Sequence, residues 1–167
     1  MNAGLFVGRV VLGLLMAAHG SQKLFGWFGG YGLAAVSGYF ETLGFRPGRI
    51  FALTAALAEV SGGLLAASGF LGPIGPALIV SVMIVAAVSA HGSNGVLGAN
   101  SMETPILYGA GAAALALTGP GAYSLDALAG LDALWTPALA WLALAIAVVG
   151  GIVNLTLRRT APHAVAA

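Results

Sequence analysis

The sequence predicts an all-α membrane protein, a bundle of transmembrane helices with one short helix lying along the membrane surface. Two observations predict this class. Of the 167 residues, 59% are hydrophobic and only 7% are charged, against about 25% charged in an average soluble protein. The apolar residues also fall into five runs, and a membrane-spanning helix needs about 20 mostly apolar residues. This number of charged residues is too small to cover a surface that faces water. We therefore expect the chain to lie in a lipid bilayer.

The first two expected spans each carry ionisable residues. The first runs roughly over residues 5–24, with Arg9, His19 and Lys23 inside it or at its edges. A cleaved signal peptide is the weaker alternative for this stretch, because no Ala-x-Ala site is evident and Arg9 sits deep in it. The second span runs roughly over residues 51–71 and ends where glycine and proline alternate in the sequence GPIGP.

The third and fourth expected spans are shorter. The third runs roughly over residues 77–91 and closes at His91. The fourth runs roughly over residues 103–118, beginning at Glu103 and ending at the sequence Gly-Pro-Gly. Proline near the start of this run, in the sequence ETP, is compatible with a helix because the first turn lacks hydrogen-bonded N–H groups.

The fifth expected span, roughly residues 135–157, has the clearest interfacial anchors. Trp135 and Trp141 lie toward one end, and Arg158 and Arg159 follow the other end. Tryptophan and basic residues are both enriched where membrane helices meet water.

An aromatic segment separates the first two spans. Residues 25–51 hold eight of the fourteen aromatic residues. The sequence GWFGG within it reads as an interfacial turn, and apolar residues then recur at helical spacing from Leu33 to Leu43. We expect a surface helix from Tyr31 to Phe45. It would act either as a lid in the headgroup layer or as an ordinary aromatic belt.

The charges also predict an orientation. We call the membrane face at the amino end side A and the opposite face side B. With five spans, side B holds five basic residues, which are Lys23, Arg46, Arg49, Arg158 and Arg159. Side A holds Arg9 with Asp126 and Asp132. Because cytoplasmic loops carry the excess of lysine and arginine, we expect side B in the cytoplasm and the amino end outside.

Four ionisable residues should gather in the side-B half of the bundle. His19 lies near the exit of the first span, His91 ends the third and Glu103 begins the fourth. Glu59 lies about eight residues into the second span, roughly 12 Å deep at 1.5 Å per residue. Ionisable groups at membrane depth usually face the bundle interior or water.

These residues are the candidates for ligand binding or proton relay, together with three neighbours of His19. Gln22 and Lys23 follow His19 by three and four residues and share its helix face, and Trp27 lies in the turn beyond them. We expect His19 and Glu59 to face one cavity, with Lys23 and the Trp27 turn at its mouth.

Each candidate also has a structural explanation. Glu59 could form a salt bridge to Arg9 or Lys23, His19 could be a packing histidine, and Lys23 could reach toward the headgroups. His91 and Glu103 lie near an interface and could be solvated loop ends. We expect no metal, because the Glu-x-x-His spacing of helix-bundle metal sites is absent.

The chain also resembles the DoxX family of bacterial membrane proteins. The resemblance lies in "GRVVLGLLMAAHGSQKLFGWFGG", "GYFETLGF", "LAEVSGGLLAASGFLGPIGPAL" and "GPGAYSLD", which occur in this order over roughly residues 5–126. It implies a four-helix bundle over residues 1–126 in the bacterial inner (plasma) membrane. Residues 127–160 would then add a fifth span that the family lacks, and residues 161–167 a loose tail.

The family resemblance also implies a loose association with redox chemistry. Some relatives look like subunits of a thiosulfate:quinone oxidoreductase, and others like membrane partners of oxidative-stress enzymes. The chain has no cysteine, which excludes a thiol relay, a disulfide and thiolate-held iron–sulfur or zinc sites within it. Its net charge of +1 gives no reason to expect a nucleic-acid partner.

The favoured hypothesis is a redox-associated subunit that binds a quinone or a similar lipid-soluble molecule. No cofactor is expected to be held by the chain's own ligands, so electrons would come from a partner protein. The fifth span could dock that partner or a second copy of the chain. The alternative hypothesis is a non-enzymatic scaffold or a small-molecule transporter.

Overall fold

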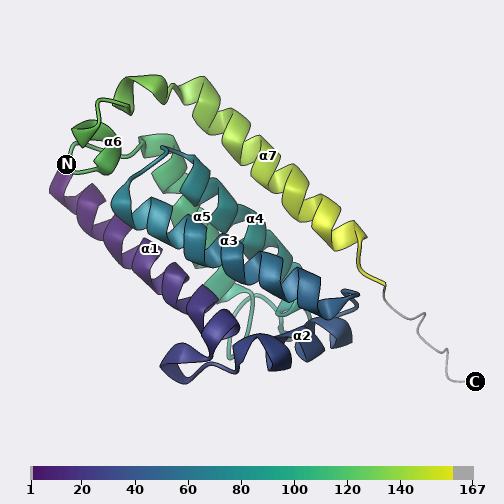
Figure 1. The fold of residues 1–167 in the computed structure, drawn as a ribbon. Coiled ribbons are helices and arrows are strands. Elements are labelled where there is room, and N and C mark those ends of the chain that lie inside the picture. Colours follow the sequence, from purple (N-terminus) through teal and green to yellow (C-terminus); the bar gives the residue numbers. More distant parts are fainter. Residues whose placement is uncertain (1, 160–167) are drawn as a thin grey trace, which may run out of the picture.

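The computed structural model describes residues 2–159, and every regular element in this range is helical (Figure 1). Five long helices make the bundle: α1 (Asn2–Phe25), α3 (Gly48–Ser68), α4 (Ile74–Ser89), α5 (Glu103–Thr118) and α7 (Pro137–Thr156). The short elements are α2 (Gly32–Thr42), α6 (Leu125–Leu128) and the 3₁₀ turns η1 (Trp27–Gly29), η2 (Gly92–Asn94) and η3 (Asp132–Leu134). The predicted all-helical membrane bundle is confirmed. The expected tail, residues 161–167, lies outside the described residues.

Helices occupy all five positions where spans were predicted. Three of them, α1, α3 and α7, are long and apolar enough to cross a membrane. Helices α4 and α5 have 16 residues each, about 24 Å at 1.5 Å per residue, which is shorter than a hydrocarbon core of about 30 Å. The five-span count therefore stays a prediction for α4 and α5.

The contact between α1 and α3 depends on glycine. A Cβ atom on Gly13 would lie 2.5 Å from the carbonyl oxygen of Gly63, and a Cβ atom on Gly63 would lie 2.5 Å from that of Gly13. Neither position has room for a side chain. Small residues let membrane helices approach closely enough for backbone contact, so this pair sets the separation of α1 and α3.

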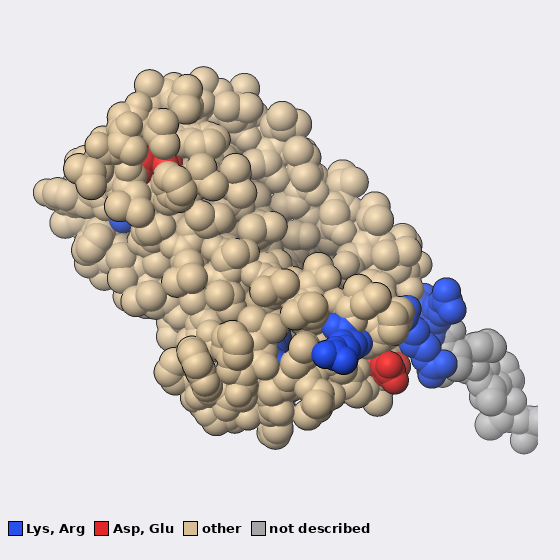
Figure 2. Space-filling view, viewed as in Figure 1, with Lys and Arg blue, Asp and Glu red and all other residues tan. Residues whose placement is uncertain are grey.

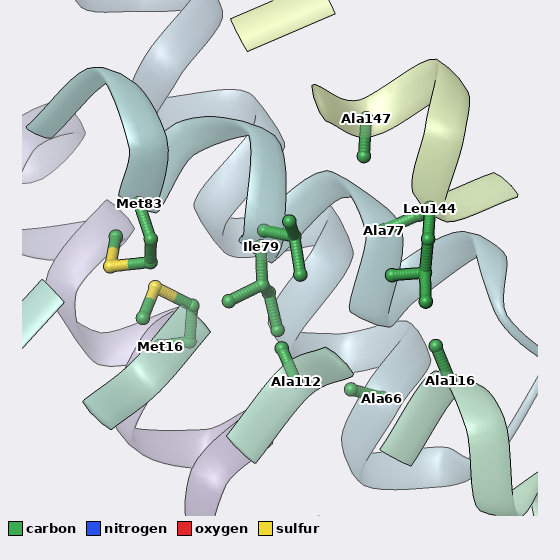
Figure 3. Close-up of a cluster of buried hydrophobic side chains, with 10 residues drawn as sticks. Met16, Ala66, Ala77, Ile79, Met83, Ala112, Ala116, Leu144 and Ala147 are labelled. Atoms are coloured by element: carbon green, nitrogen blue, oxygen red, sulfur yellow. The ribbon is translucent and has the colours of Figure 1, made fainter. Parts of the chain in front are cut away.

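The hydrophobic core centres on α4. Ile79 is fully buried, and the surrounding cluster draws side chains from α1, α3, α5 and α7. Figure 3 shows Met16 of α1 and Met83 of α4 with their thioether ends toward one another, and Ile79 directed toward Ala112 of α5. Leu144 of α7 packs in the same cluster. The fifth long helix is therefore part of the bundle and not an appendage beside it.

Helix α2 lies across the side-B end of the bundle, against α3 and α1 (Figure 1). A helix was predicted from Tyr31 to Phe45, and the observed one spans Gly32–Thr42, followed by a turn through Leu43 and Gly44. The predicted helix is confirmed. Its location in the headgroup layer stays a prediction.

The carboxyl end of α7 is fastened to the turn between α2 and α3. The Arg158 Nε atom donates a hydrogen bond of 2.9 Å to the carbonyl of Leu43, and the Arg159 backbone N–H donates one of 2.7 Å to Gly44. The Arg158 guanidinium also lies 5.8 Å from the centre of the Phe45 ring. These two arginines, expected only as cytoplasmic anchors, thus join the last helix to the second.

The charged residues are unevenly distributed along the bundle. In Figure 2 the lysine and arginine atoms gather at the end where α2 and the carboxyl end of α7 lie. The opposite end of this face shows a small patch of blue and red, and the band between the two ends is uncharged. An uncharged band between charged ends is the distribution expected of a bundle embedded in lipid.

Candidate functional site

A cavity of about 790 Å³ lies at the side-B end of the bundle, bordered by α2. Helices α1, α2, α3, α4 and α7 all contribute to its wall. Most of the wall is apolar, with Val36, Phe40, Phe51 and Val82 among its larger side chains. The polar side chains include His19, Gln22, Lys23, Ser81, His91 and Asn154.

The three α1 candidates meet at this cavity. His19, Gln22 and Lys23 share one helix face, as predicted, and all three line the wall. The His19 ring meets the ring of Tyr108 edge-to-face, with 5.7 Å between the centres. Gln22 donates a hydrogen bond of 3.1 Å from Nε2 to the carbonyl of Phe28, which ties the following turn to α1.

Lys23 forms an ion pair with Glu59 through Nζ and Oε1. Glu59 is only 1% exposed, and its other oxygen, Oε2, has no hydrogen-bond partner among the described residues. Burying a carboxylate is costly unless a cation and hydrogen bonds compensate it. Lys23 supplies the cation, and half of the carboxylate remains unsatisfied.

Glu59 itself does not line the cavity. The prediction that His19 and Glu59 both face one cavity is therefore wrong. The reason is its place around α3. Glu59 belongs to the stripe of Ala56 and Gly63 that packs on α1, whereas Ala55 and Ala58 line the cavity. Successive helical residues are about 100° apart, so Glu59 reaches the site only through Lys23. Of the two salt bridges considered, the structure forms the one to Lys23.

Trp27 also lies away from the cavity. Its side chain is 58% exposed and lies beside the ring of Phe25, with 4.7 Å between the ring centres. Gly29 and Gly30 of the same turn line the wall instead. A Cβ atom on Gly30 would lie 2.5 Å from the backbone carbonyl oxygen of Gln22, so the turn folds back tightly on α1 and directs the indole outward. The Trp27 turn thus borders the cavity, as expected, through Gly29 and Gly30, but the Trp27 side chain, a binding candidate, is not part of the wall.

The two candidates at the ends of α4 and α5 separate. His91 lines the cavity, with Nδ1 2.7 Å from the carbonyl oxygen of Asn100. Glu103, the first residue of α5, is exposed and is not part of the wall. The interpretation of Glu103 as a solvated helix start therefore fits its position. Within residues 2–159, no three His, Asp or Glu side chains gather in a way that could hold a metal ion.

Sequence reasoning missed the polar residues that α4 and α7 contribute. Ser81 and Asn154 line the cavity, and neither is ionisable, so the pattern of charges in the apolar spans does not mark them. A signal was present, because Asn154 is the only amide within the apolar run of α7. Uncharged polar side chains in membrane helices also seek hydrogen-bond partners.

A second polar cluster lies at side A. Arg9, 3% exposed, donates hydrogen bonds to the carbonyls of Pro120 (2.8 Å) and Tyr123 (2.5 Å). Asp126, fully buried, accepts the backbone N–H groups of Leu71 (3.0 Å) and Gly72 (2.7 Å). The sequence GPGAYSLD is thereby fixed to α1 and to the turn after α3.

The fold and the side-B cavity define a multi-pass helical membrane protein with an amphiphilic pocket at one end. A family model described as DoxX matches residues 4–92. The chain belongs to the DoxX family. The match covers α1 to α4 and stops short of α5 and α7, so the resemblance expected over residues 93–126 stays a prediction. Comparison with curated proteins and with solved structures gives no match.

Proposed function

We propose that this protein is a redox-associated subunit of the bacterial inner membrane whose side-B cavity binds a quinone or a similar lipid-soluble molecule. The observation that carries the proposal is the cavity itself. Its volume of about 790 Å³ is within the range of about 300–1,000 Å³ typical of small-molecule sites, which are mostly apolar with a few polar groups. Here the polar groups include the imidazole of His19 and the ammonium group of Lys23.

The polar groups suit a molecule that exchanges protons with the protein. Reduction of a quinone to a quinol takes two electrons and two protons. In this proposal the electrons come from a partner protein, because the chain has no cysteine that could relay them. Histidine is the side chain best suited to proton exchange near neutral pH, so His19 is expected to donate one of the two protons to a bound quinone oxygen, and water entering the cavity supplies the other.

Lys23 and Glu59 have different roles in this proposal. Lys23 lines the cavity, and its ammonium group can donate a hydrogen bond to a quinone oxygen. Glu59 lies behind it, and its paired oxygen holds the Lys23 ammonium group in place. Glu59 is therefore a positioning residue, which acts on the ligand through Lys23.

Quinone retention tests the proposal. The protein is purified in mild detergent, and its organic extract is analysed by liquid chromatography with mass spectrometry. We expect quinone at a substantial fraction of one per chain, a reduction of about tenfold in His19→Leu, and no change in Glu103→Gln. Absence of quinone from the folded wild-type protein, together with no binding of added quinone, contradicts the proposal.

The scaffold alternative has one observation in its favour, because the Lys23–Glu59 pair joins α1 to α3 whether or not a ligand binds. The variant Glu59→Gln separates the two hypotheses. A scaffold role predicts a lower melting temperature with unchanged quinone retention. The proposed function predicts that retention falls as well, because Lys23 loses the group that positions it.

A further inference from the structure

We infer that Asn154 of α7, together with Ser81 of α4, is a second recognition point in the cavity and hydrogen-bonds an oxygen of the ligand on the side away from α1. The inference rests on the proposed function, since it requires that the cavity bind a molecule. It adds that the ligand has polar atoms in two places. It also assigns part of ligand recognition to a helix outside the family match, which ends at residue 92.

Asn154 is an uncompensated polar group in an apolar helix. Helix α7 is otherwise almost free of hydrogen-bonding side chains. The nearby hydroxyl of Thr156 is satisfied within the helix, through a bond of 2.7 Å to the carbonyl of Val153. The side-chain amide of Asn154 forms no such bond within residues 2–159, and it faces the cavity. Asn154 is half-buried, and no described residue uses the donor or acceptor of its amide, so a ligand oxygen can bind it without first breaking a bond within the protein.

Ser81 lies on the neighbouring helix close to Asn154 along the bundle. Gly151 of α7 packs closely on α4, because a Cβ atom there would lie 3.1 Å from the carbonyl oxygen of Ser81. Asn154 follows Gly151 by three residues, nearly one turn, and both Asn154 and Ser81 line the cavity. The hydroxyl of Ser89 bonds back to the carbonyl of Val85, whereas the Ser81 hydroxyl forms no such bond within the described chain.

The position of Asn154 is fixed from both directions. The contact of Gly151 with α4 precedes it, and the bonds from Arg158 and Arg159 to the turn at Leu43 and Gly44 follow it. Asn154 is therefore held between two anchored points less than three turns apart. A polar group held in place loses little freedom when it binds, and this favours affinity.

The chemistry of an amide narrows the ligand class. Asn154 can donate and accept a hydrogen bond, whereas the ammonium group of Lys23 can only donate. An amide therefore suits both the carbonyl oxygen of a quinone and the hydroxyl of the corresponding quinol. We therefore expect Asn154 to contribute to the binding of both quinone and quinol. A site whose only polar groups were cations would not bind the two forms equally well.

The test compares two exchanges on α7. Wild type, Asn154→Leu and Thr156→Val are purified in detergent and titrated with a short-chain benzoquinone and with its quinol. Asn154→Leu should weaken the binding of both forms about tenfold, which corresponds to about 1.4 kcal/mol. Thr156→Val is the matched control, because Thr156 is exposed and outside the cavity wall, and it should change neither affinity.

Folding is monitored in the same samples. Asn154 has no hydrogen-bond partner to lose, so Asn154→Leu should melt at or above the temperature of the wild type. If the variant melts lower, Ser81→Ala provides the second measurement, with an expected weakening of about threefold to fivefold, within the range for one modest hydrogen bond.

Two results overturn the inference, and they differ in what they say about the proposed function. If wild type binds and His19→Leu weakens binding, but Asn154→Leu and Ser81→Ala bind like wild type, the second recognition point is wrong and the proposed function stands. If the folded wild-type protein binds neither the quinone nor the quinol, the proposed function fails and the inference fails with it.

Discussion

Each end of the bundle buries a carboxylate and holds a basic residue near it, but the two ends compensate the carboxylate in different ways. At side A, Arg9 donates to two backbone carbonyls, and both oxygens of Asp126 accept backbone N–H groups. At side B, Lys23 pairs with one oxygen of Glu59 and leaves the other without a partner. The large cavity that α2 borders lies beside this second pair.

The difference separates a structural cluster from a candidate site. At side A the partners are backbone groups of loops, so the charges fix the loops in place and no oxygen of Asp126 remains free. At side B the partners are side chains on two helices, and the polar groups around the cavity are only partly satisfied. Unpartnered buried polar atoms occur at both ends, since Arg9 Nε and Trp135 Nε1 at side A also lack partners within the described residues. The wall of the side-B cavity, with His19, Gln22 and Lys23, is therefore the reason that our proposal lies at side B.

The largest effect we expect is an all-or-none difference in labelling between the two ends. The chain has no cysteine, so single cysteines can be introduced without background. On intact cells, a membrane-impermeant maleimide should label Leu128→Cys at side A and should fail to label Thr42→Cys at side B. The variant Leu97→Cys, between α4 and α5, should behave like Thr42→Cys if both of these helices cross the membrane. Labelling of Thr42→Cys but not of Leu128→Cys would show that the orientation is reversed. Labelling of both Leu97→Cys and Leu128→Cys, with Thr42→Cys unlabelled, would reject the five-span count.

The next largest effect is expected from Asp126→Ala. This change leaves the N–H groups of Leu71 and Gly72 without acceptors, at about 1–3 kcal/mol for each buried donor. Asp126→Ala should therefore lower the melting temperature more than Lys23→Met, Glu59→Gln or Arg158→Ala. Quinone retention per folded molecule should not change. The exposed Asp132→Ala is the control and should melt like wild type. A loss of retention in folded Asp126→Ala would mean that side A also takes part in binding.

A double-mutant cycle at Lys23 and Glu59 should give an intermediate effect. Lys23→Met leaves the buried Glu59 carboxylate uncompensated, and we expect it to lower the stability by about 1–3 kcal/mol. Glu59→Gln leaves only the partly exposed Lys23 without its partner, and we expect a smaller loss of about 1 kcal/mol. The double variant should lose less than the sum of the two, because no uncompensated charge remains. Thermal unfolding in detergent measures all four proteins. Strict additivity would show that the ion pair does not contribute to stability.

The smallest effect should come from Arg158→Ala. The change removes the bond to Leu43 and the contact with the Phe45 ring, worth roughly 1 kcal/mol together, since each such contact near the surface contributes only modestly. Because Leu43 and Asn154 both line the cavity, quinone affinity should also fall, by about twofold to threefold. Arg49→Ala, which removes an exposed charge from the same side, is the matched control. Equal behaviour of the two variants would show that the α7 attachment does not support the site.

The fold could be predicted closely from the sequence because its signals are local. Apolar runs and glycine-proline turns marked all five long helices, and helical spacing marked α2. The boundaries shifted where one residue decides the helix end. Helix α3 was expected to reach residue 71 but ends at Ser68, because Gly69 takes a left-handed conformation with φ 64°, and such a glycine commonly ends a helix.

The site could be predicted only in part, because contacts between helices are not local. The shared face of His19, Gln22 and Lys23 follows from spacing on one helix. The pairing of Lys23 with Glu59 depends on how α1 and α3 are rotated about their axes, and a rotation of 100° would have placed Glu59 in the cavity. The presence of Asn154 in the cavity wall depends on how α7 packs on α4, and no sequence motif predicts that packing.

The attachment of α7 to the turn between α2 and α3 has a consequence for how the protein is assembled. Ribosomes synthesise α7 after every other helix of the bundle, so α1 to α5 are made before Asn154 and Arg158. Until then the turn at Leu43 and Gly44 lacks its bonds to Arg158 and Arg159, and the cavity wall lacks Asn154. The cavity wall is therefore complete only once α7 has been made, and a product truncated before α7 would present an incomplete wall.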